Sequence, residues 1–264
     1  MKKGVLFIVI LVAVAFLAMP LTSFAGGTIS GKVTYNGKPV DKEFMFAKFP
    51  NPKFCPKIPN KALSQGEKRI LKSIDVGAGG ALKGAVVVVA DIEDQAFIDG
   101  YKGTDVIAAF CEFQPYTGVV VPMKNFHVEN TDADPDDPKS LKGVLHNPHS
   151  FEVMGASSST IFNIALAEKG SKLDKPATMR KAKKGSFFRL QCDQHEFMQS
   201  YFVPVTTKHF AVVKDDGTYE IPDVPAGKHK LVIWHPGEGK GMKTEVEVDV
   251  AEGGKATANA ALGK

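Results

Sequence analysis

The sequence predicts an all-β protein, and three observations lead to this prediction. Short segments that alternate apolar and polar residues recur along the 264-residue chain, which is the two-residue period of a half-buried strand. The 25 glycines and 16 prolines supply turn residues between these segments. No stretch of the chain after residue 25 shows sustained 3.6-residue periodicity with helix caps. Many short strands separated by turns are typical of a β-sandwich.

Composition narrows the function classes. Hydrophobic residues make up 44% of the chain and charged residues 23%, which is ordinary for a globular protein and argues against disorder. The formal net charge is +4, from 33 Lys and Arg against 29 Asp and Glu. Such a small excess, spread over the whole chain, does not indicate a nucleic-acid partner, and we expect none.

The first 25 residues are typical of an export signal. Lys2 and Lys3 form a basic start, an apolar run follows over residues 4–21, and the small residues Ser23 and Ala25 suit a cleavage site. We therefore expect a periplasmic or otherwise exported, soluble protein with no membrane span after cleavage. The apolar run is longer than a usual signal core, so a retained membrane anchor is the alternative.

Two of the expected strands have a distinctive pattern. Residues 85–90 form a β-branched run that suits a strand buried on both faces. In the alternating segment 186–192, Phe188, Leu190 and Cys192 share one face. The expected strands are residues 28–35, 85–90, 119–121, 126–128, 186–192, 219–221, 230–234 and 244–250.

Other local signals predict turns and loops. Asn36-Gly37 predicts a hairpin turn after the first strand. Residues 161–169 predict one or two helical turns. The glycine-rich run 77–84 leads into a strand and lacks the ending of a phosphate-binding loop, so we interpret it as a turn. Residues 132–137 have carboxylates at calcium-like spacing, but the glycine that a calcium loop needs is missing. A solvated acidic loop is the simpler interpretation.

The segment 191–198 contains the candidate metal-binding residues. Cys192, His195 and Met198 bring a thiol, an imidazole and a thioether within seven residues, at the end of an alternating strand. Soft sulfur ligands favour Cu(I), and imidazole binds copper in both oxidation states. A further nitrogen ligand must come from elsewhere in the chain, and the segment 145–149 offers two histidines.

This loop and its surroundings resemble a known family. The Cys-x-x-His-x-x-Met loop, the alternating strand before it and the upstream His-Asn pair resemble the type 1 copper proteins, the cupredoxins. The loop spacing is similar to that of amicyanin-like members, and the wider frame resembles periplasmic methylamine-utilisation or plastocyanin-like proteins. The resemblance covers about residues 80–240 and implies a Greek-key β-sandwich. The frame comprises residues 111–115, 128–132, 146–149, 162–166, 192–198 and 234–235.

The resemblance implies one type 1 copper ion. The implied ligands are His146, Cys192 and His195 in a trigonal arrangement, with Met198 as the weak axial ligand. Asn147 would hydrogen-bond across to the loop that bears Cys192 and steady the site. His149 is the alternative to His146, because residues three apart on a strand face opposite sides and the two should not both face one metal.

The cysteine count then suggests a disulfide. An exported protein pairs its thiols, and three cysteines cannot all be paired. If Cys192 is a copper ligand, Cys55 and Cys111 remain, and we expect them to form a disulfide that anchors the proline-rich segment 50–56.

A second resemblance links the two ends of the chain. Residues 215–234 resemble carboxypeptidase-regulatory-like modules, which have a transthyretin-like sandwich, and residues 27–33 match the usual opening of such modules. We expect a second, smaller sandwich that is interrupted by the copper domain, with tandem sandwiches and a separate N-terminal arm as the alternative. The expected parts are residues 1–25 as signal peptide, 26–92 and 206–264 as the two parts of the regulatory-like module, and 93–205 as the cupredoxin-like copper domain.

These features predict a one-electron carrier rather than an enzyme. A mixed site of thiolate, imidazole and thioether is a compromise between the preferences of Cu(II) and Cu(I). The alternatives are a periplasmic protein for copper storage or delivery, and a structural or interaction module with a vestigial site. A copper oxidoreductase would need a further histidine-bound copper, and the remaining histidines show no clustered spacing.

The expected partner is a redox protein, such as a c-type cytochrome or a periplasmic dehydrogenase. Residues 168–184 contain seven basic and two acidic residues, a local charge of 7 − 2 = +5. If this basic run borders the copper site, it would steer an acidic partner toward it. The alternative is a solvated face without a role in recognition.

Overall fold

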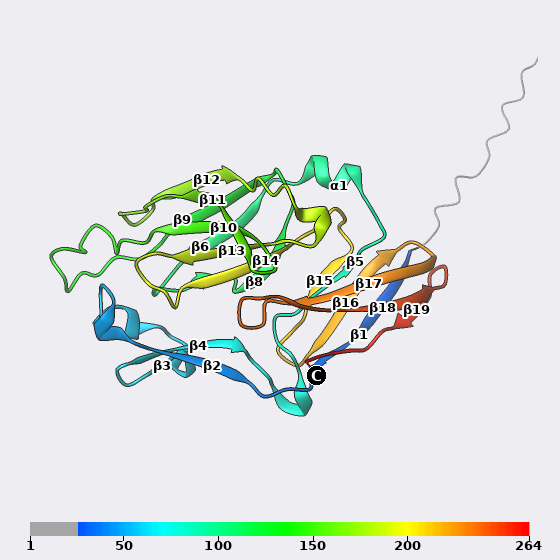
Figure 1. Ribbon diagram of the computed structural model, residues 1–264, viewed down its shortest axis with the longest axis horizontal. Coiled ribbons are helices and arrows are strands. Elements are labelled where there is room, and N and C mark those ends of the chain that lie inside the picture. Colours follow the sequence, from blue (N-terminus) through cyan, green and yellow to red (C-terminus); the bar gives the residue numbers. More distant parts are fainter. Residues whose placement is uncertain (1–25, 264) are drawn as a thin grey trace, which may run out of the picture.

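The computed structural model of the protein describes residues 26–263 and confirms the all-β prediction (Figure 1). The described residues form 20 strands, one short α-helix and five 3-10 turns. None of these helices is both long enough and apolar enough to cross a membrane. The predicted export signal lies outside the described residues.

A central sandwich is built from two sheets. One sheet has the order β11-β10-β13-β14-β8, and the other has the order β12-β9-β6-β7. The bounds of these strands are β6 Thr104–Ala108, β7 Phe113–Gln114, β8 Thr117–Val120, β9 Asn125–Asn130, β10 Pro148–Met154, β11 Ser157–Asn163, β12 Lys172–Pro176, β13 Phe187–Cys192 and β14 Gln199–Pro204. Phenylalanines fill the space between the sheets, and the rings of Phe126 and Phe188 stack with centroids 4.4 Å apart. The predicted face of Phe188, Leu190 and Cys192 points into this core.

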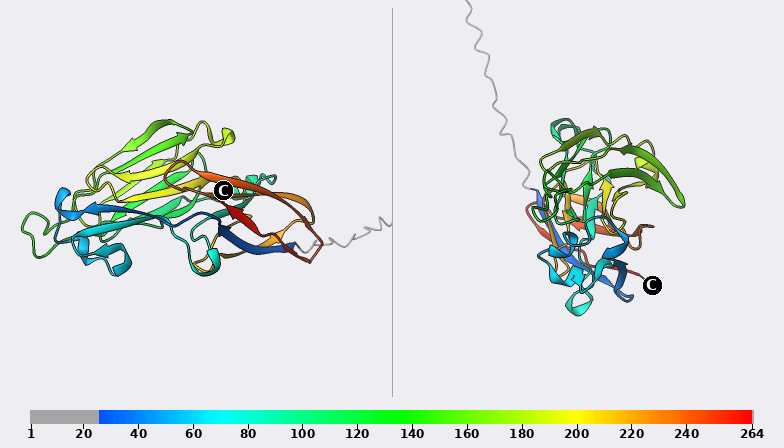
Figure 2. Two further views of the ribbon diagram at one scale, coloured as in Figure 1. Left: turned by 60° about the horizontal axis from the view of Figure 1, so that its bottom comes forward. Right: turned by 90° about the vertical axis from the view of Figure 1, so that its left-hand side faces the viewer.

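A second, smaller sandwich joins the two ends of the chain. One sheet has the order β16-β1-β19, with β20 also paired to β1, and the other has the order β15-β5-β17-β18. The bounds are β1 Gly27–Tyr35, β5 Val86–Val89, β15 Phe210–Val212, β16 Thr218–Val224, β17 Gly227–His235, β18 Met242–Val250, β19 Lys255–Thr257 and β20 Ala260–Leu262. Figure 2 shows this sandwich at one end of the elongated molecule. Its likeness to a regulatory-like module stays a prediction.

Strand β5 lies in the layer where the two sandwiches meet. Val87 and Val89 point into the core of the second sandwich, whereas Val86 and Val88 pack against the outer face of the central sandwich. All four side chains are buried, which is the two-sided burial that the β-branched run predicts. Phe187 packs against Trp234 across the same contact. The two sandwiches therefore share an apolar interface rather than a flexible link.

An N-terminal arm, residues 38–75, leaves the second sandwich and reaches the central one. It forms the small sheet β2-β4-β3, with β2 Val40–Met45, β3 Ser64–Gln65 and β4 Lys68–Ile74, and the 3-10 turns η1 Phe46–Lys48, η2 Cys55–Lys57 and η3 Lys61–Leu63. In Figure 1 these turns, in blue, lie beside the left-hand end of the central sandwich. Phe46, Phe54 and Cys55 are part of the central core.

Two local predictions are wrong. Asn36-Gly37 does not close a hairpin, because β2 pairs with β4 and not with β1, so the chain leaves the sheet at this point. Residues 161–169 form no helical turn; β11 extends through Asn163, and Leu166 bridges to His146. The remaining helical elements are α1 Gln95–Gly100, η4 Ala78–Gly80 and η5 Ala182–Lys184. Asp94 caps α1 by accepting a hydrogen bond from the backbone N–H of Phe97.

Candidate metal centre

The loop between β13 and β14 presents the predicted sulfur and imidazole groups. Strand β13 ends at Cys192, and two backbone hydrogen bonds close the loop that follows. The Cys192 N–H donates to the Met198 carbonyl at 3.0 Å, and the Met198 N–H donates to the His195 carbonyl at 2.8 Å. These bonds hold the three residues in a tight turn. Cys192, His195 and Met198 are all essentially without solvent exposure.

His146 reaches the same place from a different part of the sheet. Its backbone exchanges two hydrogen bonds with Leu166, and Pro148 at the start of β10 pairs with Cys192 at the end of β13. The antiparallel register of β10 and β13 therefore brings His146, which is 192 − 146 = 46 residues from Cys192 in sequence, beside the ligand loop. The His146 side chain is fully buried.

Three ligand groups converge at this point. One ligand atom from each of His146, Cys192 and His195 lies within 4.8 Å of the others. The Cys192 Sγ is 3.7 Å from the His195 Nδ1, and the two imidazole rings are 5.2 Å apart between centroids. The Nδ1 of His146 is buried and has no hydrogen-bond partner among the described residues. A buried, unpaired nitrogen beside a thiol is costly unless it binds a ligand, so these residues fit a soft transition metal.

The far nitrogen of each imidazole is held by an oxygen. The Nε2 of His146 lies 2.8 Å from a carboxylate oxygen of Asp132, and the Nε2 of His195 lies 3.2 Å from the carbonyl oxygen of Pro50. Each Nε2 therefore carries the proton that it donates, and each Nδ1 keeps its lone pair. Metal-binding histidines are usually oriented in this way.

Asn147 contacts the ligand loop twice. Its backbone N–H donates to the Cys192 Sγ at 3.3 Å, and its side-chain Nδ2 donates to the Asp193 carboxylate at 3.4 Å. The first contact lowers the electron density on the sulfur, and the second holds the two segments in register. Both contacts support the positioning role that the resemblance implies for this residue.

His149 does not take part in the cluster. Its Nδ1 lies 3.1 Å from the Asp193 carboxylate, and its Nε2 lies 3.0 Å from the Thr160 hydroxyl. Both ring nitrogens thus have polar partners on the outer face of the sheet, where the His149 side chain is 18% exposed. The geometry favours His146 over His149 as the ligand.

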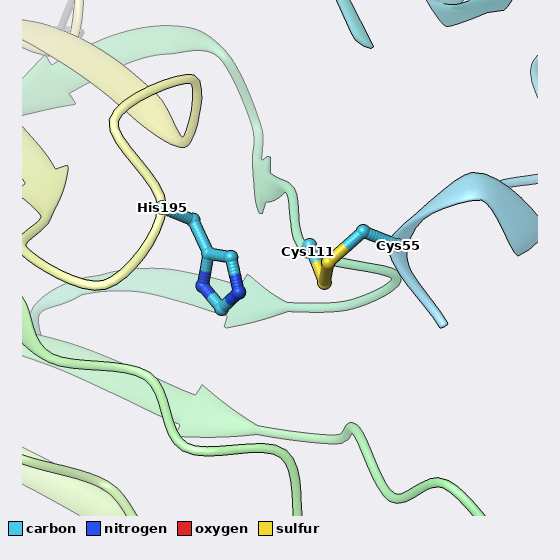
Figure 3. Close-up of side chains that lie close together, drawn as sticks. All are labelled: Cys55, Cys111 and His195. Carbon is cyan, nitrogen blue, oxygen red and sulfur yellow. A yellow bond between two sulfur atoms is a disulfide. The ribbon is translucent and has the colours of Figure 1, made fainter. Parts of the chain in front are cut away.

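Cys55 and Cys111 form the expected disulfide, and it lies directly beside the ligand loop. Figure 3 shows the His195 ring turned toward the two sulfur atoms. A ligand atom of His195 and both sulfurs fall within 4.8 Å of one another. Because both sulfurs are used in the disulfide bond, we do not count them as metal ligands. The disulfide instead joins the N-terminal arm to the wall of the metal centre.

Residues 46–55 form a cap over His195. Phe49 packs edge-on against Phe197 with ring centroids 5.1 Å apart, and Phe54 stacks on Phe110 at 6.1 Å. From the other side, the guanidinium of Arg69 lies 5.3 Å from the centre of the Phe197 ring. This packing explains why His195 has no solvent exposure.

Asp132 links His146 to the segment that bears Cys111. Its carboxylate accepts hydrogen bonds from the backbone N–H groups of Phe110 and Cys111, at 2.6 and 2.9 Å, besides contacting His146. Phe110 and Cys111 both have a positive φ, near 52° and 55°, which turns two successive N–H groups toward one anion. The strain of these two residues is offset by the charged hydrogen bonds that they make.

The expectation that residues 132–137 form a solvated acidic loop is thus wrong for Asp132 and Asp134. Asp132 and Asp134 are buried, at 3% and 4% exposure. Asp134 forms an ion pair with Lys57 of the arm at 3.1 Å. Sequence reasoning also missed Pro50, because no local pattern shows which carbonyl covers a histidine 145 residues away. The Asn-x-Asp pattern at residues 130–132 is the one signal that could have identified Asp132.

The charges of the site favour a thiolate. Burial opposes ionisation of the thiol, but the imidazoles of His146 and His195 outweigh it and lower the pKa of Cys192 to about 6. Burial likewise disfavours a charged His146, yet the Asp132 carboxylate and the Cys192 sulfur overcome this and raise the pKa of His146. A thiolate is the form in which cysteine binds a metal.

We expect the metal-free protein to show this ionisation directly. The ultraviolet absorption of the thiolate should disappear as the pH falls through about 6, whereas an ordinary thiol with a pKa of 9.0 would lose it three units higher. Because the pKa is lower in the folded state, the thiolate contributes stability that is complete above pH 9 and is lost as the pH falls through 6. The Cys192→Ser variant is the control and should lack this transition. A midpoint near 9 would contradict the proposed ionisation.

Asp132 can be tested with a nearly isosteric change. Asp132→Asn removes the charge and presents an amide that cannot accept all the hydrogen bonds from Phe110, Cys111 and His146. We expect the affinity for copper to fall about 10- to 100-fold, measured by competition with a chelator. Asp136→Asn, on the exposed part of the same loop, is the matched control and should bind as the unchanged protein does. Equal affinities in the two variants would assign Asp132 a purely structural role.

The C-terminal part of the basic run at residues 168–184 is remote from this site. Lys181 donates its backbone N–H to Glu152, and Lys183 lies 3.8 Å from Glu93. Glu152 pairs with Phe188, four residues before Cys192 along β13, which is about 13 Å of strand. The conditional expectation that the run borders the metal centre is therefore not met by Lys181 and Lys183, whereas Lys169 lies beside Lys142, to whose carbonyl its N–H donates at 2.9 Å.

Comparisons with known proteins give distant likenesses. Neither a protein-family model nor a characterised protein sequence matches the chain. A copper-containing nitrite reductase from Thermus scotoductus SA-01 aligns with a TM-score of 0.29 and 13% identity, over 40% of this chain and 23% of that one. Two mutants of amicyanin in the Cu(I) form align with a TM-score of 0.28 and 15% and 16% identity, over 47% of this chain and all of theirs. This chain thus spans less than a quarter of the matched nitrite reductase.

Proposed function

We propose that the protein is an exported type 1 copper protein of the cupredoxin kind that carries single electrons. The observation that carries the proposal is the convergence of His146 Nδ1, Cys192 Sγ and His195 Nδ1, with each imidazole held through its Nε2. Met198, buried on the same loop, is the proposed axial ligand. Copper bound there would supply a one-electron couple between Cu(II) and Cu(I).

The chain's own residues favour electron transfer over ligand exchange. The Asp132 carboxylate and the Pro50 carbonyl fix both imidazoles, and the Asn147 N–H fixes the thiolate. A site whose ligands are held before the metal binds needs little rearrangement when the charge of the metal changes. The complete burial of the ligands and the disulfide beside them also exclude water. Both features suit a carrier better than a protein that must load and release copper.

The export proposal rests on two features. The sequence of residues 1–25 is typical of an export signal. A disulfide forms and persists in an oxidising compartment such as the periplasm. In that compartment the proposed partner is a redox protein, such as a c-type cytochrome or a dehydrogenase.

Addition of Cu(II) to purified metal-free protein tests the proposal. We expect an intense visible absorption from charge transfer between the Cys192 thiolate and copper, and one reversible electron per protein in a redox titration. Tight binding of Cu(I) without this absorption would instead support copper storage or delivery. Absence of binding would leave a structural module with a vestigial site.

Met198 is tested by its effect on the reduction potential. Met198→Leu keeps the side-chain volume but removes the axial donor. Loss of a donor costs the more highly charged Cu(II) more than Cu(I), so we expect copper to be retained and the potential to rise. A rise of at least about 59 mV, equal to a tenfold change in the ratio of the two oxidation states, is expected in a redox titration. Met179→Leu, a buried methionine of the same core, is the control. An unchanged potential in Met198→Leu would remove this residue from the ligand set.

A further inference from the structure

The cap, residues 46–55, lies between His195 and the solvent. His195 has no solvent exposure, so a redox partner has no access to the edge of its ring. The Nε2–H of His195 is bonded to the Pro50 carbonyl, and Pro50 itself is exposed. One connection from the ring of this ligand to the surface therefore runs through a single hydrogen bond and one residue of the cap.

Building on the proposed function, we propose that the outer face of the cap is the docking surface for an acidic redox protein. Its centre is apolar, because Pro50 and Pro52 are exposed there and Leu141 is 56% exposed beside them. The side-chain amide of Asn51 donates to the Ser140 hydroxyl at 2.8 Å, which joins the cap to the segment that bears Leu141. We call this surface the port.

Exposed lysines flank both segments that form the port. The exposed ones are Lys48, Lys53, Lys139 and Lys142. Lys48 and Lys53 lie two and three residues from Pro50, so their Cα atoms are within about 11 Å of it.

Few carboxylates offset these lysines. Asp136 is paired with Lys57 at 2.8 Å. Lys57 also pairs with the buried Asp134 at 3.1 Å. Asp137 accepts hydrogen bonds from Ser140 and from the Lys139 N–H, so three carboxylates stand against five lysines, a local charge of 5 − 3 = +2.

The ligand loop itself offers an acidic partner no comparable approach. Its exposed charged residues are Asp193 and Glu196, both acidic. An apolar centre flanked by a net positive charge is suited to brief, specific encounters, in which charge steers the partner and the apolar contact sets the distance. Copper held by His146, Cys192 and His195 would give up one electron to the oxidised partner in such an encounter, and the proton on His195 Nε2 would remain in its hydrogen bond to the Pro50 carbonyl.

Two anionic probes replace the unidentified partner in the test. Hexacyanochromate(III) is a paramagnetic trianion, and added to the metal-free protein it should broaden the amide NMR signals of residues 47–53 and 139–142. Hexacyanoferrate(III), a trianion of the same shape, accepts one electron from the Cu(I) protein in a stopped-flow measurement. The first readout requires no copper.

The variants separate the port from general charge effects. Lys48→Glu with Lys53→Glu should abolish the broadening and slow the reduction of hexacyanoferrate(III) at least about fivefold at 0.01 M salt, where the Debye length is about 30 Å. The difference should shrink at 0.1 M salt. Lys183→Glu with Lys184→Glu makes the same charge change at exposed lysines outside the port and should have a small effect.

The outcomes distinguish the two proposals. Broadening of NMR signals centred on other residues would contradict the port as the docking surface. Equal slowing of hexacyanoferrate(III) reduction by the two double variants would contradict it as well. Absence of the visible copper–thiolate absorption in the unchanged protein would overturn the proposed function, whatever the NMR experiment shows about anion docking.

Discussion

Replacing Cys192 with serine is expected to abolish completely the visible absorption that we predict for the proposed copper site. That absorption requires a bond between copper and a thiolate, and Cys192 is the one free cysteine of the chain, because Cys55 and Cys111 are paired. A serine hydroxyl remains protonated at neutral pH and is a hard ligand, so it cannot replace the thiolate. The spectrum of the variant after addition of Cu(II) is the measurement.

The structure provides a control for this experiment. Serine is close to cysteine in size and can still accept the N–H of Asn147, so the fold of Cys192→Ser should be intact by circular dichroism. His146 and His195 also remain in place for residual copper binding through nitrogen. Intense colour in this variant would reject the site, since no other thiolate is present among the cysteines of the chain.

Removal of the disulfide is expected to have the largest effect on stability. Cys55 and Cys111 are 56 residues apart, and a cross-link across such a loop restricts the unfolded chain by about 4 kcal/mol. For a protein of this size each kcal/mol corresponds to about 2–4 °C in melting temperature, so Cys55→Ala with Cys111→Ala should melt about 8–16 °C lower. Thermal denaturation of the metal-free protein measures this change.

The same double variant tests the link between the arm and the metal centre. Without the disulfide, the cap is held by the packing of Phe49 on Phe197 and by the ion pair of Lys57 with Asp134. We expect copper to be lost to a chelator faster than from the unchanged protein, while the visible absorption keeps its position because the ligands are unchanged. A melting temperature equal to that of the unchanged protein would show that the arm is held without the covalent bond.

The sequence predicts those parts of the site that are contiguous in the chain. Cys192, His195 and Met198 form one turn after a strand, and a strand that alternates so regularly leaves little doubt about which face Cys192 occupies. The β-branched run at β5 was equally informative, because a strand covered on both faces has no polar positions.

The missing parts depend on contacts between distant segments. Pro50 and Asp132 contact the histidines through a carbonyl and a carboxylate, groups that occur throughout any chain and have no signature at one position. Asn36-Gly37 was interpreted as a hairpin from its local preference for a tight turn. The next strand, β2, pairs instead with β4 of the arm, and local sequence contains no information on that choice of partner.

The pairing of β1 has a consequence for the order in which the chain becomes structured. β1 pairs with β16 and, in parallel, with β19 and β20, and the N–H of Lys32 donates to Asn259, 227 residues later. His146 and Cys192 are only 192 − 146 = 46 residues apart. As the chain emerges from the ribosome or a membrane pore, His146 and Cys192 can therefore come together before the strands that pair with β1 are available. Until then the backbone N–H and C=O groups along both edges of β1 are unpaired. A chain that ends before β19 would keep one of those edges exposed and would be prone to aggregate through it.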